Sequence, residues 1–168
     1  ALASSLAILG TEQKELGTLV IDLGAGVTEY AVYSAGVIKH TGVLAVGGDH
    51  VSNDLAYGLK VPLARAEQIK IDHGSALIDP GARDRKIDLS DDSLIPGRQV
   101  CLGHLQQIMS MRLQETLELI AKGIGQAGLI EYLRAGVVLC GGGARIPHIT
   151  RLARDVFKLP VAIGRAST

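Results

Sequence analysis

The sequence predicts an α/β fold built in the order βββαβαβ, with a small α+β insert between its two halves. Apolar runs at residues 18–23 and 136–140 both lead into glycines, which is typical of buried strands that end at a turn. Residues 105–124 carry apolar side chains at every third or fourth position, which indicates a long amphipathic helix. The segment 76–100 is polar and interrupted by proline and glycine, so it suits an inserted lobe.

The first half is expected to begin with a short helix at residues 2–9. Three strands should follow at 18–23, 28–33 and 37–46. Because short turns that contain glycine separate these strands, we predict that they are antiparallel neighbours in one sheet.

A pair of helices is expected after the third strand. Asp49 suits the N-cap of a helix over 50–59. Pro62 suits the first turn of the next helix, which should end before Gly74. Within the insert, residues 86–89 alternate like a short strand.

The second half is dominated by the long helix. Its predicted buried stripe consists of Leu105, Met109, Leu113, Leu117, Ile120 and Ile124. A strand over 136–140, a helix over 147–158 and a last strand over 160–163 should complete the sheet.

The composition excludes several classes of function. Hydrophobic residues make up 47% of the 168 residues, enough for the core of one domain. The 17 basic and 17 acidic side chains cancel, and aromatic residues are only 3%, so we expect no nucleic-acid partner. No apolar run approaches the roughly 20 residues of a membrane span. Cys101 and Cys140 lie outside any CxxC pattern and are expected to be reduced thiols, and the scattered histidines lack metal-ligand spacing.

The glycine loop after the first strand has the composition of a phosphate-binding turn. Gly24 and Gly26 flank Ala25, and such a bare turn exposes successive N–H groups to an anion. In the dinucleotide fingerprint a helix follows the glycines, whereas here the chain alternates like a strand and Glu29 replaces the third glycine. The pattern therefore argues against a Rossmann site.

Asp22 adds a requirement for a cation. A carboxylate beside a phosphate is repelled unless a cation lies between them, and Mg²⁺ fits because it needs few carboxylates and keeps several waters. Thr28 offers a hydroxyl to the same corner. The alternative is that Asp22 is a turn acid that caps its own backbone.

A second glycine cluster follows the strand over 136–140. Gly141, Gly142 and Gly143 let a flat ring or a phosphate touch the main chain, and Arg145 can stack on such a ring. The alternative is an ordinary turn between a strand and a helix. Two such turns in one chain favour a shared cleft.

These motifs resemble known ones. "DLGAGVTE" resembles the second phosphate motif, and "VVLCGGGARIP" the adenosine motif, of the actin/Hsp70/sugar-kinase superfamily. Between them, "GGDHVSNDLAYGL" and "AEQIKIDHGSAL" closely resemble the FtsA family of bacterial cell-division proteins. The similarity extends over residues 15–163 and implies a ribonuclease H-like fold, that of actin-like ATPases. It corresponds to the second half of that fold, so a domain II fragment is expected.

The resemblance implies ATP and Mg²⁺ as cofactors. Asp22 would act on the Mg²⁺ shell, the first glycine loop would cradle the β- and γ-phosphates, and Glu67 with Lys70 would reach the ribose and the adenine edge. Without the resemblance, Glu67 and Lys70 read equally well as a solvated helix face. The implied nucleotide-binding residues are Asp22, Gly24, Ala25, Gly26, Val27, Thr28, Gly48, Glu67, Lys70, Gly141, Gly142, Gly143 and Arg145.

No catalytic residue is assigned. In the family the cleft lies between two similar halves, and the first phosphate loop and the residue that positions the attacking water belong to the other half. We therefore expect slow ATP hydrolysis at most in the full-length parent and none by this chain alone.

The resemblance also implies two subdomains and a protein partner. Residues 1–60 and 101–168 would form subdomain IIA, and 61–100 the inserted subdomain IIB. In the family this lobe receives the acidic C-terminal tail of FtsZ. Lys86, Arg98 and Arg112 are candidate contacts because a peptide carboxylate prefers Arg forks. The alternative is that they are solvated surface charges.

Self-association into actin-like filaments is also implied. The expected location is the cytoplasm, peripheral to the inner face of the bacterial cell membrane at the division site. The family's C-terminal membrane helix is not expected here, because the chain stops at Thr168 without a basic amphipathic tail. The alternatives are half of an MreB-like filament protein, of a PilM-like pilus adaptor, or of a sugar or acetate kinase.

Overall fold

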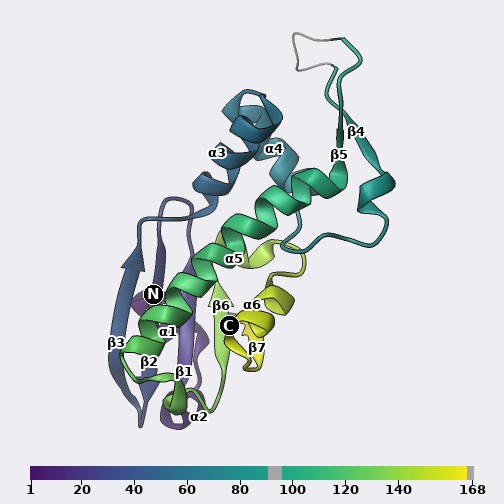
Figure 1. Ribbon diagram of the computed structural model, residues 1–168. Helices are drawn as coiled ribbons and strands as arrows, with labels where there is room; N and C mark the ends of the chain where they lie inside the picture. Colours follow the sequence, from purple (N-terminus) through teal and green to yellow (C-terminus); the bar gives the residue numbers. More distant parts are fainter. Residues whose placement is uncertain (91–95, 166–168) are drawn as a thin grey trace.

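The computed structural model describes residues 1–90 and 96–165, and a five-stranded sheet forms its centre (Figure 1). Its strands, in spatial order, are β3 (Val37–Leu44), β2 (Thr28–Ser34), β1 (Thr18–Leu23), β6 (Val137–Cys140) and β7 (Val161–Ile163). The first three strands are antiparallel neighbours, as predicted, whereas β6 is parallel to β1 and β7 is parallel to β6. The predicted α/β fold class is confirmed.

The two faces of the sheet are covered unequally. Side chains of a strand alternate between the faces, so Leu19 and Ile21 of β1 pack into the larger core with helices α5 (Leu102–Gln126) and α6 (Ile149–Phe157). Val20 points the other way, into a smaller cluster beside helix α1 (Leu2–Ile8). The face bearing α5 therefore holds most of the apolar burial.

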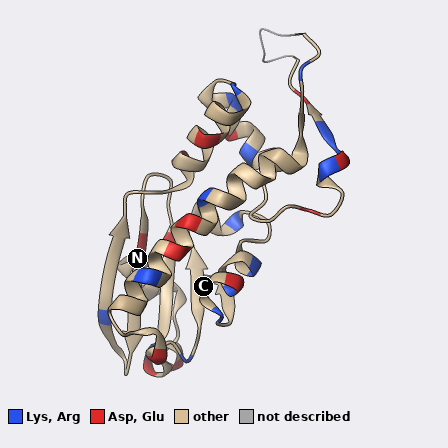
Figure 2. Ribbon diagram, in the orientation of Figure 1, with Lys and Arg blue, Asp and Glu red and all other residues tan. Residues whose placement is uncertain are grey.

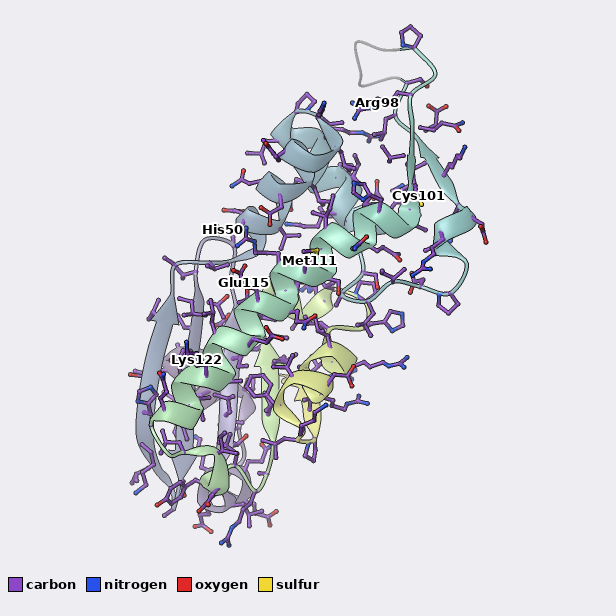
Figure 3. The ribbon with its side chains drawn as sticks, viewed as in Figure 1. His50, Arg98, Cys101, Met111, Glu115 and Lys122 are labelled. Carbon is purple, nitrogen blue, oxygen red and sulfur yellow. The ribbon has the colours of Figure 1, made fainter. Side chains whose placement is uncertain are left out.

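Helix α5 supplies the spine of the larger core. All six residues of its predicted stripe are buried, and they lie at spacings of three and four because such positions share one face of a helix. The opposite side of the helix faces solvent, where the Met111 side chain is 66% exposed (Figure 3). The helical period of the sequence is thus confirmed.

The insert contains more strand than the sequence indicated. Helices α3 (Gly48–Leu59) and α4 (Leu63–His73) lie side by side at one end of the sheet, beside the upper half of α5 (Figure 1). Beyond them, β4 (Lys86–Asp88) pairs with β5 (Gln99–Cys101) in a separate antiparallel ribbon. Strand β5 was not predicted, although β4, which has the same length, was. Residues 91–95 of the insert lie outside the described residues.

Short helices complete the chain and include one that the sequence did not predict. Helix α2 (Thr11–Leu16) lies between α1 and β1, and the 3₁₀ turns are η1 (Ala82–Asp84), η2 (Ile130–Tyr132) and η3 (Gly142–Arg145). The prediction that Asp49 caps α3 is wrong, because the N-cap is Gly47 and Asp49 lies in the first turn. The N–H of Gly47 donates to Nδ1 of His50, which fixes this helix end.

Charges are mixed over the surface rather than gathered by sign. Figure 2 shows basic and acidic residues interspersed along α5 and around the rest of the molecule. Both cysteines are free thiols. In the parts of the chain described, no helix is both long and apolar enough to cross a bilayer.

We predict that Met109 and Met111 differ sharply in their contribution to stability, although they lie two residues apart on α5. Met109 is fully buried, so Met109→Ala should lower the free energy of unfolding by about 2–5 kcal/mol through lost burial and the cavity left behind. Met111→Ala should change it by less than about 0.5 kcal/mol. Chemical denaturation measures both. Equal losses would contradict the packing described for α5.

Candidate functional site

The glycine loop after β1 is tied to the start of α3 by its main chain. The carbonyl of Gly24 accepts a hydrogen bond from the N–H of Gly48 at 2.9 Å, and that of Ala25 accepts one from Asp49 at 2.8 Å. Across the described residues, the N–H groups of Ala25 and Gly26 donate to no protein acceptor. The loop therefore has its acceptors engaged and its donors available, which is what an anion requires.

Gly47 permits this close approach. A Cβ at this position would lie 2.3 Å from the carbonyl oxygen of Ala25 and 2.7 Å from that of Gly24. Both neighbours are backbone atoms, which no rotamer change relieves. Glycine at position 47 is thus a condition for the contact between α3 and the loop.

The two predicted glycine turns meet across one cavity of about 400 Å³. A volume of this size lies in the range of small-molecule sites. One wall comes from the loop and the start of α3, one from α4, and one from the turn after β6. The lining residues are Gly24, Ala25, Gly48, Asp49, Glu67, Lys70, Ile71, Gly142, Gly143, Arg145, Ile146 and Pro147.

Eight of the predicted nucleotide-binding residues line this cavity, and five do not: Asp22, Gly26, Val27, Thr28 and Gly141. Asp22 lies on the face of the sheet that carries α1, where its carboxylate accepts a hydrogen bond from the Ser4 hydroxyl. It still borders the second turn, since a Cβ on Gly141 would lie 2.5 Å from Oδ1 of Asp22.

Thr28 is buried, and its side chain has a different task. Its hydroxyl donates to the carbonyl oxygen of Val46 at 2.7 Å. It therefore holds the connection from β3 to α3 rather than a ligand in the cavity. Gly141 lines a separate hollow of about 320 Å³, and Val27 is 45% exposed.

The sequence missed four lining residues: Asp49, Ile71, Ile146 and Pro147. Ile71 is 67% exposed on α4, one residue after Lys70, and offers an apolar surface at the cavity. Ile71 lies four residues from Glu67, so the two share one helix face, but this spacing does not distinguish a cavity residue from a core residue.

Polar groups at the α3–α4 wall form a closed ring. Nζ of Lys70 lies 2.7 Å from Oε2 of Glu67 and 3.1 Å from the carbonyl oxygen of Gly48. The hydroxyl of Ser52 contacts both Oε2 of Glu67 and the same carbonyl oxygen. The ring therefore joins the first turns of α3 to the middle of α4.

The ring keeps the Glu67 carboxyl ionised. Its partial burial acts to raise its pKa, but the hydrogen bonds from Lys70 and Ser52, together with the charge of Lys70, lower the pKa below its ordinary value. Since the pKa is lower in the folded protein, the stabilisation is present above the ordinary carboxyl pKa of about 4.3 and is lost as the pH falls below it.

The residues predicted to contact a protein partner differ in their surroundings. The guanidinium of Arg98 donates to the carbonyls of Leu59 and Lys60 at the C-terminal end of α3 (Figure 3). Lys86 is exposed on β4.

Arg112 of α5 makes a two-pronged contact with Asp54 at 2.6 and 3.0 Å, and also bonds Glu115. The hydrogen bond to Asp54 and the two carboxylate charges raise the pKa of Arg112, against the opposing effect of burial. An incoming carboxylate would therefore have to compete with Asp54.

Residue types that hold metals are not clustered. Within residues 1–90 and 96–165, no group of three or more His, Cys, Asp or Glu side chains is placed to hold a metal ion.

The overall fold matches that of a known class of proteins. MreB 5 of Spiroplasma citri bound to AMPPNP is similar with a TM-score of 0.80 over 96% of this chain and 52% of that chain, at 23% identity. The five-stranded sheet, its helices and the cavity between two glycine turns define the fold of an actin-like ATPase domain.

The sequence comparisons narrow this class to one family. The chain belongs to the FtsA family of cell-division proteins, since residues 19–168 match the family described as cell division protein FtsA. FtsA of Pseudomonas aeruginosa is 32% identical over 163 residues, which cover 97% of this chain and 39% of that protein. FtsA of Neisseria meningitidis serogroup B is 38% identical over 164 residues, which cover 97% and 40%.

The chain spans about two fifths of the length of the curated relatives that it matches. It is an actin-like domain of a cell-division protein, and FtsA is favoured over the MreB-like, PilM-like and kinase alternatives.

We predict that Gly47 and Gly142 respond differently to alanine. Gly47→Ala should lower the free energy of unfolding by about 1–3 kcal/mol, because its Cβ meets backbone carbonyls. Gly142→Ala is the matched control and should be close to neutral, since a Cβ there meets nothing within 4 Å. Thermal or chemical denaturation measures both. A neutral Gly47→Ala would mean that α3 and the loop are not in the contact described.

Proposed function

We propose that this chain is the second half of an ATP-binding, actin-like cell-division protein and that the cavity between the glycine turns binds Mg-ATP. The observation that carries this proposal is the convergence of two main-chain turns, from β1 and β6, on one cavity. Such turns accept a phosphate or a flat ring because no side chain keeps the ligand away.

The charges of the cavity suggest how a nucleotide lies in it. The donors of Ala25 and Gly26 suit the phosphates. Glu67 repels phosphate but accepts hydrogen bonds from hydroxyl groups, and Lys70 is already paired with it. The ribose therefore lies beside Glu67 and the phosphates lie toward the loop.

The nucleobase would take the remaining wall. Ile71 and Ile146 offer apolar surface from opposite elements, α4 and the turn after η3. Arg145 is exposed at the same cavity and can stack its guanidinium on an aromatic ring.

Asp22 fits Mg²⁺ through water rather than by direct ligation. It lies outside the cavity lining, on the α1 side of the turn at Gly141, with Glu29 of β2 directly opposite it in the sheet. Mg²⁺ bound to phosphates keeps several waters, and a nearby carboxylate accepts their hydrogen bonds. The ion would supply charge neutralisation to the phosphates, and Asp22 would orient its water shell.

The cavity suits binding better than catalysis. Its two carboxylates are Glu67, which is paired with Lys70, and Asp49, which lies in the first turn of α3. Among the lining residues there is no histidine that could act as a base. Slow ATP hydrolysis, if it occurs in the full-length protein, therefore requires groups from outside this chain.

The insert is proposed to be subdomain IIB, residues 61–100, and to bind the acidic C-terminal tail of FtsZ. Arg98, Arg112 and exposed Lys86 would provide the positive charge. Because Arg112 already holds Asp54, a peptide carboxylate would bind by exchange with that carboxylate.

In the full-length protein, self-association into actin-like filaments and attachment to the inner face of the cell membrane at the division site would complete this role. We propose both because residues 19–168 match the FtsA family.

A first experiment separates nucleotide binding from the role of the metal. In the full-length protein, Asp22→Ala should weaken ATP binding in the presence of Mg²⁺ about tenfold or more and leave ATP binding in EDTA within about twofold. Calorimetry with both ligands measures this. Equal losses in both conditions would make Asp22 purely structural, and no ATP binding by the unaltered protein would refute the proposed function.

A second experiment tests the protein partner. With a synthetic FtsZ tail peptide, Arg112→Glu should lower the affinity about tenfold, because it removes a charge-assisted bond. The matched variant Asp54→Asn keeps Arg112 charged and removes its competitor, so it should leave the affinity unchanged or raise it. Fluorescence anisotropy measures both. A loss in Asp54→Asn equal to that in Arg112→Glu would mean that the ion pair only supports the fold.

A further inference from the structure

The ring at the α3–α4 wall contains a buried hydroxyl that no part of the nucleotide site explains. Ser52 lies on α3 and is 2% exposed. Its oxygen contacts Oε2 of Glu67 and lies 3.3 Å from the carbonyl oxygen of Gly48. A hydroxyl has one proton, and the contact with Glu67 is the shorter, so Ser52 donates to the carboxylate.

Two donors from different helices meet on one oxygen of Glu67. Ser52 reaches Oε2 from α3, and Lys70 reaches it from the next turn of α4. Among the hydrogen bonds of residues 1–90 and 96–165, Oε1 of Glu67 accepts none. The carboxylate is therefore held by one oxygen, which leaves the other free to accept a hydrogen bond, and Glu67 itself lines the cavity.

The two donors differ in what they fix. Lys70 has a long, flexible side chain on the same helix as Glu67, and it reaches α3 through the carbonyl oxygen of Gly48. Ser52 has a short side chain on the other helix, beside the carbonyl that anchors Lys70. The Ser52 hydroxyl therefore ties the carboxylate directly to α3, whereas Lys70 does so only through its bond to the Gly48 carbonyl, and α3 in turn carries the contacts with the glycine loop.

We propose that Ser52 is a positioning residue that aims the free oxygen of Glu67 at the ribose hydroxyls of the bound nucleotide and thereby makes the site select ribonucleotides. This inference rests on the proposed nucleotide site. A carboxylate oxygen is a strong acceptor for a hydroxyl, and hydrogen bonds to a charged group exceed those between neutral groups. A sugar without hydroxyls leaves that acceptor without its partner.

The test compares two probes on the full-length protein, namely ATP and 2′,3′-dideoxy-ATP, both with Mg²⁺. The unaltered protein should bind ATP about tenfold more tightly than the dideoxy analogue, since one charge-assisted hydrogen bond separates them. Ser52→Ala should lose most of this preference by weakening ATP alone, with dideoxy-ATP held within about twofold. Ser52→Thr, which keeps the hydroxyl, should retain the preference.

Two further variants distinguish the loss of the Ser52 hydrogen bond from a general effect on the fold. Ser52→Cys keeps the volume of the side chain but donates weakly, so it should behave like Ser52→Ala in a folded protein. Ser5→Ala removes an equally buried hydroxyl from α1, on the other face of the sheet, and should leave the preference unchanged.

The outcomes separate this inference from the proposed function. If neither probe binds the unaltered protein, the nucleotide site itself is refuted. If both bind with equal affinity, Glu67 does not read the sugar and the inference is wrong. It is also wrong if Ser52→Ala and Ser52→Cys weaken both probes equally, because the hydroxyl would then support the fold alone, or if folded Ser52→Thr loses the preference.

Discussion

The close approach of the α3 start to the glycine loop is the constraint on which the site depends. Two hydrogen bonds join Gly48 and Asp49 to the carbonyls of Gly24 and Ala25, and they form only because position 47 lacks a side chain. The contact has two effects at once. It fixes one wall of the cavity, and it occupies the carbonyls of Gly24 and Ala25, while in the described part of the chain the N–H groups of Ala25 and Gly26 donate to no protein acceptor.

This contact also decides where the charged side chains of the wall lie. With the first turn of α3 held at the loop, the Gly48 carbonyl becomes an anchor for Lys70, and Ser52 lies one turn further on. The Glu67 carboxylate then accepts hydrogen bonds from Ser52 on α3 and from Lys70 on α4. The electrostatics of the cavity thus follow from a backbone contact rather than from any single charged residue.

Much of the fold was predictable because its signals are long. The period of α5 repeats over 25 residues, and β1 and β6 end in glycine clusters that are visible in the sequence. The short elements α2 and β5 were missed, whereas β4 and β7, with three residues each, were predicted. Asp49 was misjudged as a cap because its acid type fits that position, while the helix begins earlier at a glycine contact that depends on tertiary structure.

The cavity was predictable only where backbone was to face the ligand. Glycine at the end of a strand indicates a position where the main chain can contact a ligand, and Gly24, Gly142 and Gly143 do line the cavity. Ile71 gave no comparable signal, since an apolar residue that lines a cavity resembles one that packs in a core. For Thr28, residue type alone does not show which way a hydroxyl points, and the side chain is buried against Val46.

Helix α3 has twelve residues, so at about 1.5 Å per residue it is a rod of roughly 18 Å. One tip is fastened to the carbonyls of the glycine loop, and the other tip receives the guanidinium of Arg98 from the far ribbon. A helix that is held by hydrogen bonds at both ends passes a movement at one end on to the other end. Any movement of the β4–β5 ribbon must therefore either break one of these contacts or move the glycine loop as well.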